Sequence, residues 1–480
     1  MYDVTTSHPR RWLILAVICL AQLTVLLDNT ILNVAIPSLT RELDASTADI
    51  QWMINAYSLV QSGLLLTAGS AADGYGRKKM LATGLALFGI GSAVARFATT
   101  SGQLIAARAG MGVGGALLLT TTLAVAMQIF APEEQPRAIG IWAAVNALGF
   151  ATGPLVGGLV LDHFRWGAIF LLNLPVAALA LAAVLALVPE SRNPRGDRPD
   201  LLGALLSTIG MAALVFAIIS GPARGWTSAR VLVSAAVAAV ALTLFARWES
   251  RIPYPMLDLA FFRDRRFTGA VGGVVLVTFG MGGALFLLTQ HLQSVLGYGP
   301  LEAGLRTAPL ALTVVVLNFS GLAAKATARL GTPLSVLGGM VLMAGGLVSI
   351  ASGGEGYGGV AAGLVLIGVG CAVANPAMAH AIMSAIPPEK AGVGAGVNGT
   401  LAEFGNGLGV AVLGAVLSAS LTAGKPLSDG LGAGLLVGAV AVLGGGLVTA
   451  VLLRRADKAK ADKEKADREK PDKGTAGVLV

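Results

Sequence analysis

Long apolar runs alternate with short polar segments along almost the whole chain. A helix that crosses the hydrocarbon core of a bilayer needs about 20 predominantly apolar residues. The pattern therefore predicts an all-α membrane protein with fourteen spans, at approximately residues 12–34, 50–68, 80–97, 103–127, 138–161, 168–188, 201–220, 230–247, 267–290, 303–323, 333–351, 358–383, 394–418 and 430–453.

Two longer polar connectors divide the predicted spans into three groups. Residues 189–200 are polar and rich in proline, and residues 250–267 contain four arginines. The connectors enclose one pair of spans and leave six on either side, which indicates an internally duplicated transporter with an inserted hairpin. The predicted organisation is a cytoplasmic N-terminus (1–11), an N-terminal six-helix bundle (12–188), connectors with a two-helix hairpin (189–266), a C-terminal six-helix bundle (267–453) and a charged cytoplasmic tail (454–480).

The composition agrees with a protein surrounded by lipid. Only 12% of the 480 residues are charged and the mean hydropathy is +0.75, whereas a soluble domain carries about 25% charged residues. Such a chain cannot cover a water-soluble globule of this size with polar groups. The two cysteines and four histidines are scattered without ligand spacing, so neither a disulfide framework nor a metal site is predicted.

The net charge of +8 is better explained by membrane topology than by binding to nucleic acid. With a cytoplasmic N-terminus, the cytoplasmic segments before the tail carry 17 Lys and Arg residues, whereas the external segments carry six. An excess of basic residues marks cytoplasmic loops. Because the number of predicted spans is even, both termini are expected in the cytoplasm and the chain in the cell membrane.

Among the charged residues inside predicted spans, Asp28, Arg108 and Glu403 are the candidates for function, and Arg306 also falls within a span. A charged side chain at the bilayer centre costs at least about 2.5 kcal/mol and normally faces a cavity or a partner. The two acids therefore predict proton binding or attraction of a cationic substrate. The alternatives are local pairing at a span end for Asp28 and an interfacial position for Glu403. Arg108 stays charged and needs carboxylates, carbonyls or water as partners.

The segment GSAADGYGRKK between the second and third spans has a specific spacing of glycine and charge. Gly69 permits close approach of a helix, and Asp73 can cap or pair at the next helix N-terminus. Gly76 permits a tight turn, and Arg77 with the two lysines after it holds the loop in the cytoplasm. The alternative is a plain charged turn.

The segment GFATGPLVGG in the fifth span predicts a smooth helix face. Gly149, Gly153 and Gly157 recur every four residues, so they share one side of a helix. Pro154 bends the helix beside them, and Gly158 extends the small surface. Such a face lets another helix pack closely or slide, and ordinary packing is the alternative.

Other polar residues inside spans are weaker signals. Asn146, Asn318 and Asn375 are expected first as interhelical hydrogen-bonding residues and second as pocket residues. The glycines that follow Arg108 lack the strand–helix context of a dinucleotide loop, so they predict close helix packing. No loop of the form G-x-x-x-x-G-K-[ST] occurs, so ATP is not expected as the direct source of energy.

Together these motifs resemble the major facilitator superfamily, and more narrowly its fourteen-helix drug:proton antiporters. GSAADGYGRKK resembles the family signature between helices two and three, Arg108 with its glycines resembles the helix-four motif, and GFATGPLVGG resembles the antiporter signature of helix five. LDNTILNVAIP and RWGAIFLLNLPVA are similar to motifs of the fourteen-helix group. GIWAAVNALGFATGPLVGG and TLAEFGNGLGVAVLG resemble the subgroup that exports quaternary ammonium compounds, dyes and other lipophilic cations.

The resemblance implies a role for a helix-thirteen acid in coupling or cation recognition, and Glu403 occupies the matching position. Two departures from the family pattern concern the cytoplasmic latch. The family often has Arg after the loop aspartate, where this chain has Gly74. The second-half copy, GLAAKATARLG, has Lys325 where the pseudo-symmetric aspartate would fall. The latch is therefore better supported in the first half.

The expected function is proton-coupled multidrug efflux by alternating access, as a monomer. Proton and drug are expected to compete at Asp28 and Glu403, with Arg108 tuning these acids, and Asp73 and Arg77 are expected to latch the outward-open form. The expected partners are lipophilic, cationic drugs, protons and the lipid bilayer, and the proton motive force replaces any cofactor.

Other functions remain as alternatives. A dedicated exporter of one natural-product antibiotic or metabolite is hard to distinguish by sequence. A proton symporter is disfavoured by GFATGPLVGG. A membrane-bound enzyme is disfavoured because the sequence shows no nucleophile–base pair, metal cluster or cofactor loop.

Overall fold

The computed structural model describes residues 9–131, 133–192, 199–253, 255–353, 356–386 and 391–468, and within these ranges it is helical and contains no strand. The predicted all-α class is therefore confirmed. The predicted N-terminal segment (1–11), first connector and C-terminal tail (454–480) lie partly outside the described residues.

The described helices follow the predicted apolar runs. The first group is α1 (Arg11–Glu42), α2 (Thr47–Tyr75), α3 (Arg77–Arg96), α4 (Ser101–Ile129), α5 (Gln135–His163), α6 (Ala168–Leu171) and α7 (Asn173–Leu187). The middle segment contains α8 (Leu201–Arg224), α9 (Ala229–Glu249) and the 3₁₀ helix η1 (Leu259–Arg263). The last group is α10 (Arg265–Gln290), the π-helix η2 (His291–Val295), α11 (Pro300–Arg306), α12 (Ala308–Phe319), α13 (Leu322–Leu330), α14 (Thr332–Ser352), α15 (Tyr357–Ser384), α16 (Ala391–Thr422) and α17 (Leu427–Arg468).

Local sequence signals set several helix ends. The Ser46 hydroxyl accepts a hydrogen bond from the Asp49 amide (3.2 Å) and the Asp49 carboxylate accepts one from the Ser46 amide (3.0 Å), so a capping box starts α2. Gly76 separates α2 from α3 at φ +115°, which glycine adopts without a steric penalty. The predicted span at 168–188 is interrupted at Leu172, between α6 and α7.

The chain is a multi-pass membrane protein. Among the described residues, eleven helices are long and apolar enough to cross a membrane. Their outward faces carry large apolar side chains, and Leu179, Val233 and Val440 are 63%, 61% and 72% exposed. Side chains of this kind are stable in contact with lipid, where charged residues are costly.

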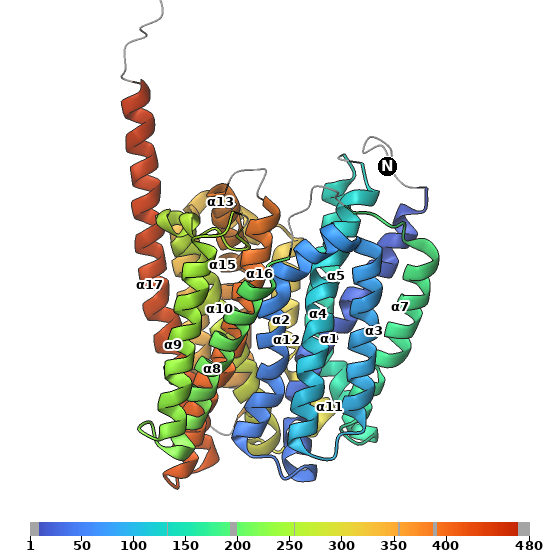
Figure 1. Cartoon of the computed structure of the whole chain (residues 1–480). Helices are drawn as coiled ribbons and strands as arrows, with labels where there is room; N and C mark the ends of the chain where they lie inside the picture. The colour runs from blue at the N-terminus through green and yellow to red at the C-terminus, as the bar shows by residue number, and fades with distance from the viewer. Residues whose placement is uncertain are drawn as a thin grey trace, which may run out of the picture.

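Figure 1 shows two groups of helices side by side. In one group α4 packs against α2 and α3, and α1 packs against α5; in the other, α10 packs against α16 and α17, and α14 against α15. The groups meet where α2 packs against α16 and where α5 packs against α11 and α12. These two seams bring residues from both groups to the middle of the molecule.

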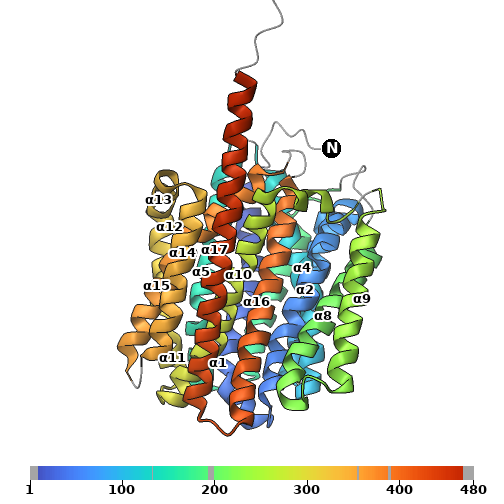
Figure 2. The ribbon, with the colours of Figure 1, turned by 90° about the vertical axis from the view of Figure 1, so that its left-hand side faces the viewer.

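The middle segment forms a hairpin on the flank of the molecule. Helix α8 packs against α2 and α16, and α9 packs against α8, as Figure 2 shows. Helix α17 continues to Arg468, beyond the predicted span end at residue 453, and projects out of the bundle in both views. The charged run that follows the last apolar span is therefore helical as far as Arg468.

Candidate functional site

The first intramembrane acid is part of a closed ion pair. Asp28 on α1 and Arg108 on α4 are each 1% exposed, and Arg108 Nη1 donates to Asp28 Oδ2. Asn173 Nδ2 donates to the other carboxylate oxygen of Asp28 at 3.1 Å. Arg108 Nε donates to the Met53 carbonyl oxygen at 3.1 Å, and the guanidinium carbon lies 4.4 Å from the centre of the Tyr57 ring. Both charged groups thus have partners inside the protein.

The glycines after Arg108 bring α2 against α4 and so build this site. A Cβ on Gly112 would lie 2.6 Å from the Tyr57 carbonyl oxygen, and one on Gly115 would lie 2.5 Å from the Tyr57 hydroxyl. Gly114 faces α3, and a Cβ on it would lie 2.8 Å from the Gly84 carbonyl oxygen. Since no side chain fits at these points, the expected close helix packing is what the structure shows.

The second intramembrane acid lies in a cavity where the two groups of helices meet. Glu403 on α16 lines this cavity, which has a volume of about 180 Å³. Drug-sized pockets usually have about 300–1,000 Å³, so this site is narrower than a bound drug requires. The thirteen lining residues are Leu26, Asn29, Thr30, Asn33, Ile54, Thr278, Met281, Gly282, Leu285, Ala402, Glu403, Asn406 and Val410.

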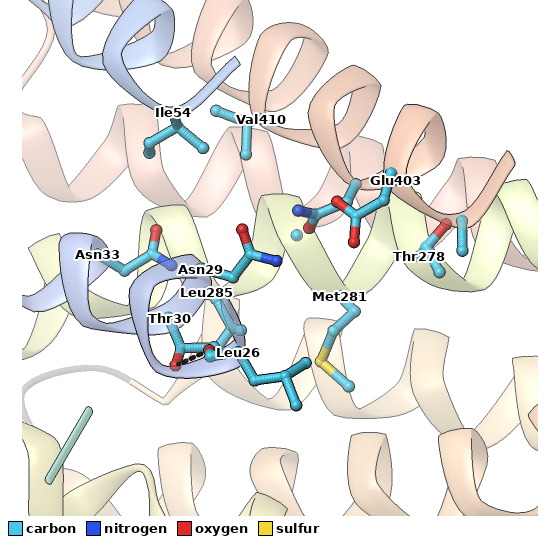
Figure 3. A pocket seen from close by; sticks show the side chains of 13 residues that line it. Leu26, Asn29, Thr30, Asn33, Ile54, Thr278, Met281, Leu285, Glu403 and Val410 are labelled. Carbon is cyan, nitrogen blue, oxygen red and sulfur yellow. Dashed lines mark hydrogen bonds between the residues drawn. The ribbon is translucent and has the colours of Figure 1, made fainter. Parts of the chain in front are cut away.

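The cavity offers hydrogen-bond acceptors and one carboxyl group, and none of its lining residues is basic. Glu403 projects into it from α16, whereas Asn29 and Asn33 project from α1 (Figure 3). Glu403 Oε2 and Asn33 Oδ1 are buried without a hydrogen-bond partner. A buried acceptor without a donor is costly, so these atoms favour a ligand that brings positive charge or protons.

Three glycines position Glu403 at this crossing. A Cβ on Gly405 would lie 2.5 Å from the Val275 carbonyl oxygen of α10, and Gly409 is just as close to the backbone of α10. On the other side of α16, a Cβ on Gly407 would lie 2.6 Å from Asn55 Oδ1 of α2. Glu403 is thereby held on a helix that is wedged between α10 and α2.

The structure places the three predicted pocket asparagines outside this cavity. Asn146 accepts a hydrogen bond from Gln22 Nε2 at 3.0 Å, which links α5 to α1 as an interhelical bond. Asn318 is exposed and donates to the Val314 carbonyl oxygen of its own helix at 3.0 Å. Asn375 is exposed on α15. The pocket interpretation of these residues therefore finds no support in the geometry around Glu403.

The asparagines that do line the cavity went unnoticed in the sequence. Asn29 and Asn33 are four residues apart on α1, and Asn406 is three residues after Glu403 on α16. Residues spaced by three or four share a helix face. The spacing of Asn406 from Glu403, and of Asn29 from Asn33, is the signal that would have found them.

The loop between α2 and α3 shows one of the two contacts predicted for Asp73, which is pairing at the start of α3 and not capping. Asp73 pairs with Arg77, whose Nη2 lies 2.8 Å from Asp73 Oδ1, and does not cap α3. The amide of Lys78 instead donates to Glu190 Oε1 at 3.2 Å, so a residue after α7 caps α3. A Cβ on Gly69 would meet no atom within 4 Å, so close packing does not explain this glycine in the present conformation.

Arg77 also reaches the end of α4. Its Nη1 donates to the Ala124 carbonyl oxygen at 3.3 Å and to Gln128 Oε1 at 3.2 Å. The loop, α3 and α4 are therefore tied together within one group of helices. Within the described part of the chain, the side-chain hydrogen bonds of Arg77 stay inside its own group of helices, so its predicted role as a latch stays a prediction.

The glycine face of α5 packs on α1. Gly149 and Gly157 lie against Leu26 and Ile31, and Gly153 lies directly against the Thr30 side chain. A Cβ on Gly158 would lie 2.5 Å from the carbonyl oxygen of Pro300, which begins α11. The smooth face is present as predicted, and its last residue also touches the other group of helices.

Pro154 also contacts the other group of helices, at α11. A Cβ on Gly304 of α11 would overlap the Pro154 carbonyl group, so the two backbones are in direct contact. Nearby, Gln293 Nε2 of η2 donates to the Val34 carbonyl oxygen of α1 at 2.9 Å. One end of the molecule is therefore shut across α1, α5, η2 and α11.

Comparisons with known proteins give this geometry a context. The Major Facilitator Superfamily model matches residues 18–410. Multidrug resistance protein Stp of Mycobacterium tuberculosis (strain CDC 1551 / Oshkosh) is 39% identical over 402 residues, which cover 83% of this chain and 74% of that protein. Methyl viologen resistance protein SmvA of Salmonella typhimurium (strain 14028s / SGSC 2262) is 35% identical over 434 residues, covering 88% and 86%.

A solved structure shows the same fold. The crystal structure of peptide transporter POT in complex with sulfate matches with a TM-score of 0.69 at 16% sequence identity, over 94% of this chain and 95% of that one. At this identity the similarity concerns the arrangement of the helices and not the substrate.

Proposed function

Because the chain belongs to the major facilitator superfamily and is therefore a membrane transporter rather than an enzyme, we propose that it exports lipophilic cationic drugs in exchange for protons. The observation that carries the proposal is the cavity around Glu403. It lies where the two groups of helices meet, it has apolar walls, and its unpaired acceptors include a carboxyl group. Transporters of duplicated architecture bind their substrates at this place.

The chemistry of the cavity favours a cation with an apolar body. Leu26, Met281 and Leu285 supply apolar surface, and methionine adapts to ligands of different shape. Glu403 supplies the opposite charge. The relatives support this class of substrate, since one is named for resistance to methyl viologen, which is a dication, and another for multidrug resistance.

Exchange follows from the unpartnered carboxyl group in the cavity. A carboxyl group at this depth is least costly when it is protonated or paired, so a proton and a cationic drug compete for Glu403. Inward movement of a proton releases about 2.3 kcal/mol per 100 mV of membrane potential. The energy source is then the proton motive force, without a cofactor, and a single copy of the chain contains the whole cavity.

The proposal includes fourteen spans with both termini in the cytoplasm. Besides the eleven apolar helices, α2, α3 and α5 are 29, 20 and 29 residues long. At 1.5 Å per residue, helices of about 20 residues reach across a hydrocarbon core. The less apolar composition of α2 fits its buried position between α4, α8 and α16. The basic residues of the loop after α2 then lie in the cytoplasm.

In this orientation the shut end, formed by α1, α5, η2 and α11, is the external one. The Gly158–Pro300 and Gly304–Pro154 contacts must open for a drug to leave. The cavity must also widen, because its present volume of about 180 Å³ is small for a drug. Alternating access supplies both changes through movement of one half against the other.

The proposal is tested by efflux of a fluorescent cationic dye from cells that lack other pumps. We expect cells that express the chain to exclude the dye, and an uncoupler to abolish the exclusion. Exclusion that persists with the uncoupler at unchanged ATP would contradict proton coupling. A panel of single antibiotics in the same cells separates multidrug export from export of one natural product.

A further inference from the structure

Helix α2 carries buried polar side chains on the side that faces α16. Gln51, Asn55 and Ser58 follow a spacing of four and three residues, so they lie on one helix face. Gln51 and Asn55 are 0% exposed and Ser58 is 2% exposed. In a membrane protein, polar residues are buried at this depth at a cost, and they mark substrate or ion pathways.

Two acceptor atoms of this face have no donor. Gln51 Oε1 and Asn55 Oδ1 are buried without a hydrogen-bond partner. Their amide nitrogens are bonded, since Gln51 Nε2 donates to the carbonyl oxygens of Val410 (3.0 Å) and Ala411 (2.9 Å), and Asn55 Nδ2 donates to the Gln51 carbonyl oxygen (3.0 Å). The orientation of both amides is thus fixed, and the acceptors need a small donor from outside the protein.

The face is continuous with the cavity around Glu403. Ile54, the neighbour of Asn55, and Val410, the partner of Gln51, both line that cavity. Asn55 Oδ1 lies against the α-carbon of Gly407, which is one helical turn after Glu403. The unpartnered Glu403 Oε2 belongs to the same region. From Glu403 the acceptors therefore continue along the seam between α2 and α16 toward the start of α2.

Water is the donor that suits these atoms. A buried water makes about three hydrogen bonds and satisfies polar groups that would otherwise be unpartnered. A quaternary cation has no N–H or O–H to donate, and the side chains of Gln51 and Asn55 are fully buried by protein. The cavity around Glu403 thus suits a cationic drug, whereas the acceptors of the seam suit water.

We propose that Asn55 and Gln51 line a hydrated passage between α2 and α16 through which protons travel between the external side and Glu403. The proposal rests on the proposed function, because it takes Glu403 as the proton site and the start of α2 as external. It separates the proton path from the drug path. Drugs use the cavity between the halves once it widens, whereas protons use the seam.

The passage makes a specific prediction about two modes of transport. Proton-driven uptake of drug into inverted membrane vesicles requires protons to leave Glu403 and return to it in each cycle. Exchange of labelled for unlabelled drug requires the cavity and the rocking of the halves, but no net proton transfer. A blocked passage must therefore slow the first mode and spare the second.

The experiment uses tetraphenylphosphonium as the probe, because this cation carries no exchangeable proton. Asn55→Leu replaces the amide with an apolar group of similar size. We expect at least a tenfold slower proton-driven uptake with exchange close to wild type. Asn55→Ser, which keeps a group that binds water, is expected to restore uptake to within threefold. Asn318→Leu makes the same change at an exposed position outside the seam and is the matched control.

Glu403→Gln separates failure of the passage from failure of the proposed function. If Glu403→Gln keeps wild-type proton-driven uptake, the proposed function at this site is wrong. If Glu403→Gln loses it but Asn55→Leu keeps it, the passage is wrong and the function stands. If Asn55→Leu loses exchange together with uptake and Asn55→Ser does not restore either, Asn55 supports the fold and the passage is again wrong.

Discussion

The two intramembrane acids lie in opposite surroundings. Both carboxylate oxygens of Asp28 are partnered, by Arg108 and by Asn173, and the residue is 1% exposed. Glu403 has an unpartnered oxygen and lines a cavity without a basic residue. A buried pair that loses one partner destabilises a protein, whereas an unpaired acid is available to a ligand. The comparison assigns stability to the first site, and cation binding with proton exchange to the second.

Helix α2 connects the two sites. Tyr57 is 0% exposed, and its ring lies against the guanidinium of Arg108, which is the partner of Asp28. Two residues before it, Asn55 faces α16 near Glu403. A change of charge at either acid therefore acts on the same segment of α2. This gives the two sites a physical connection, although they belong to different halves of the chain.

Arg108→Leu is the strongest test of this comparison. Of the variants considered, it should lower the stability of the protein most. It leaves the Asp28 carboxylate buried without its counter-charge, which costs about 3–5 kcal/mol when a buried pair loses one partner. We expect a sharply lower unfolding temperature in detergent, measured by thermal unfolding of the purified protein.

The double variant Asp28→Asn with Arg108→Leu is the control for that experiment. It removes the stranded charge, so we expect it to recover a large part of the lost stability. Equal destabilisation in the single and double variants would show that Arg108 acts through its packing on Tyr57 and not through the ion pair.

Glu403→Gln tests the other side of the comparison. The substitution keeps the shape of the side chain and breaks none of the ion pairs among the described residues, so we expect an unfolding temperature close to wild type. Export should fall, by at least about tenfold, or about 1.4 kcal/mol, for divalent methyl viologen and by less for monovalent tetraphenylphosphonium. The measurement is efflux at matched expression. Equal export of both cations by variant and wild type would remove Glu403 from recognition.

The sequence predicted the helices and the two acids better than it predicted their partners. Apolar periodicity and the cost of charge in lipid are properties of the chain itself, so Asp28, Arg108 and Glu403 could be found by reading it. Asn173 lies 145 residues from Asp28, and only packing brings them together. The spacing of Gly69 and Asp73 indicated a loop, but the contact of Glu190 with the start of α3 depends on the path of the chain after α7.

Asn173→Leu should weaken the Asp28 site without destroying it. The carboxylate keeps Arg108 and loses one neutral donor, and Ser92, which also accepts a hydrogen bond from Asn173 at 3.2 Å, loses its contact. Leaving one buried group unpartnered costs about 1–3 kcal/mol. We expect a smaller fall in unfolding temperature than for Arg108→Leu. Asn173→Asp, which places a second acid beside Asp28, should be worse than leucine; a milder effect would mean that Asn173 fills space and does not position Asp28.

Asn406→Leu is expected to have the smallest effect, confined to the cavity. Asn406 lines the cavity three residues after Glu403 and lies against Gly282 of α10, so the substitution changes one polar wall and leaves the charge in place. We expect a change of about twofold to fivefold in the concentration of tetraphenylphosphonium that half-saturates export, with unchanged dependence on the proton gradient. Measuring export as a function of drug concentration at two external pH values separates the effect on drug binding from the effect on proton coupling. A change in the pH dependence would show that Asn406 takes part in proton binding. The proton site would then consist of Glu403 together with this amide.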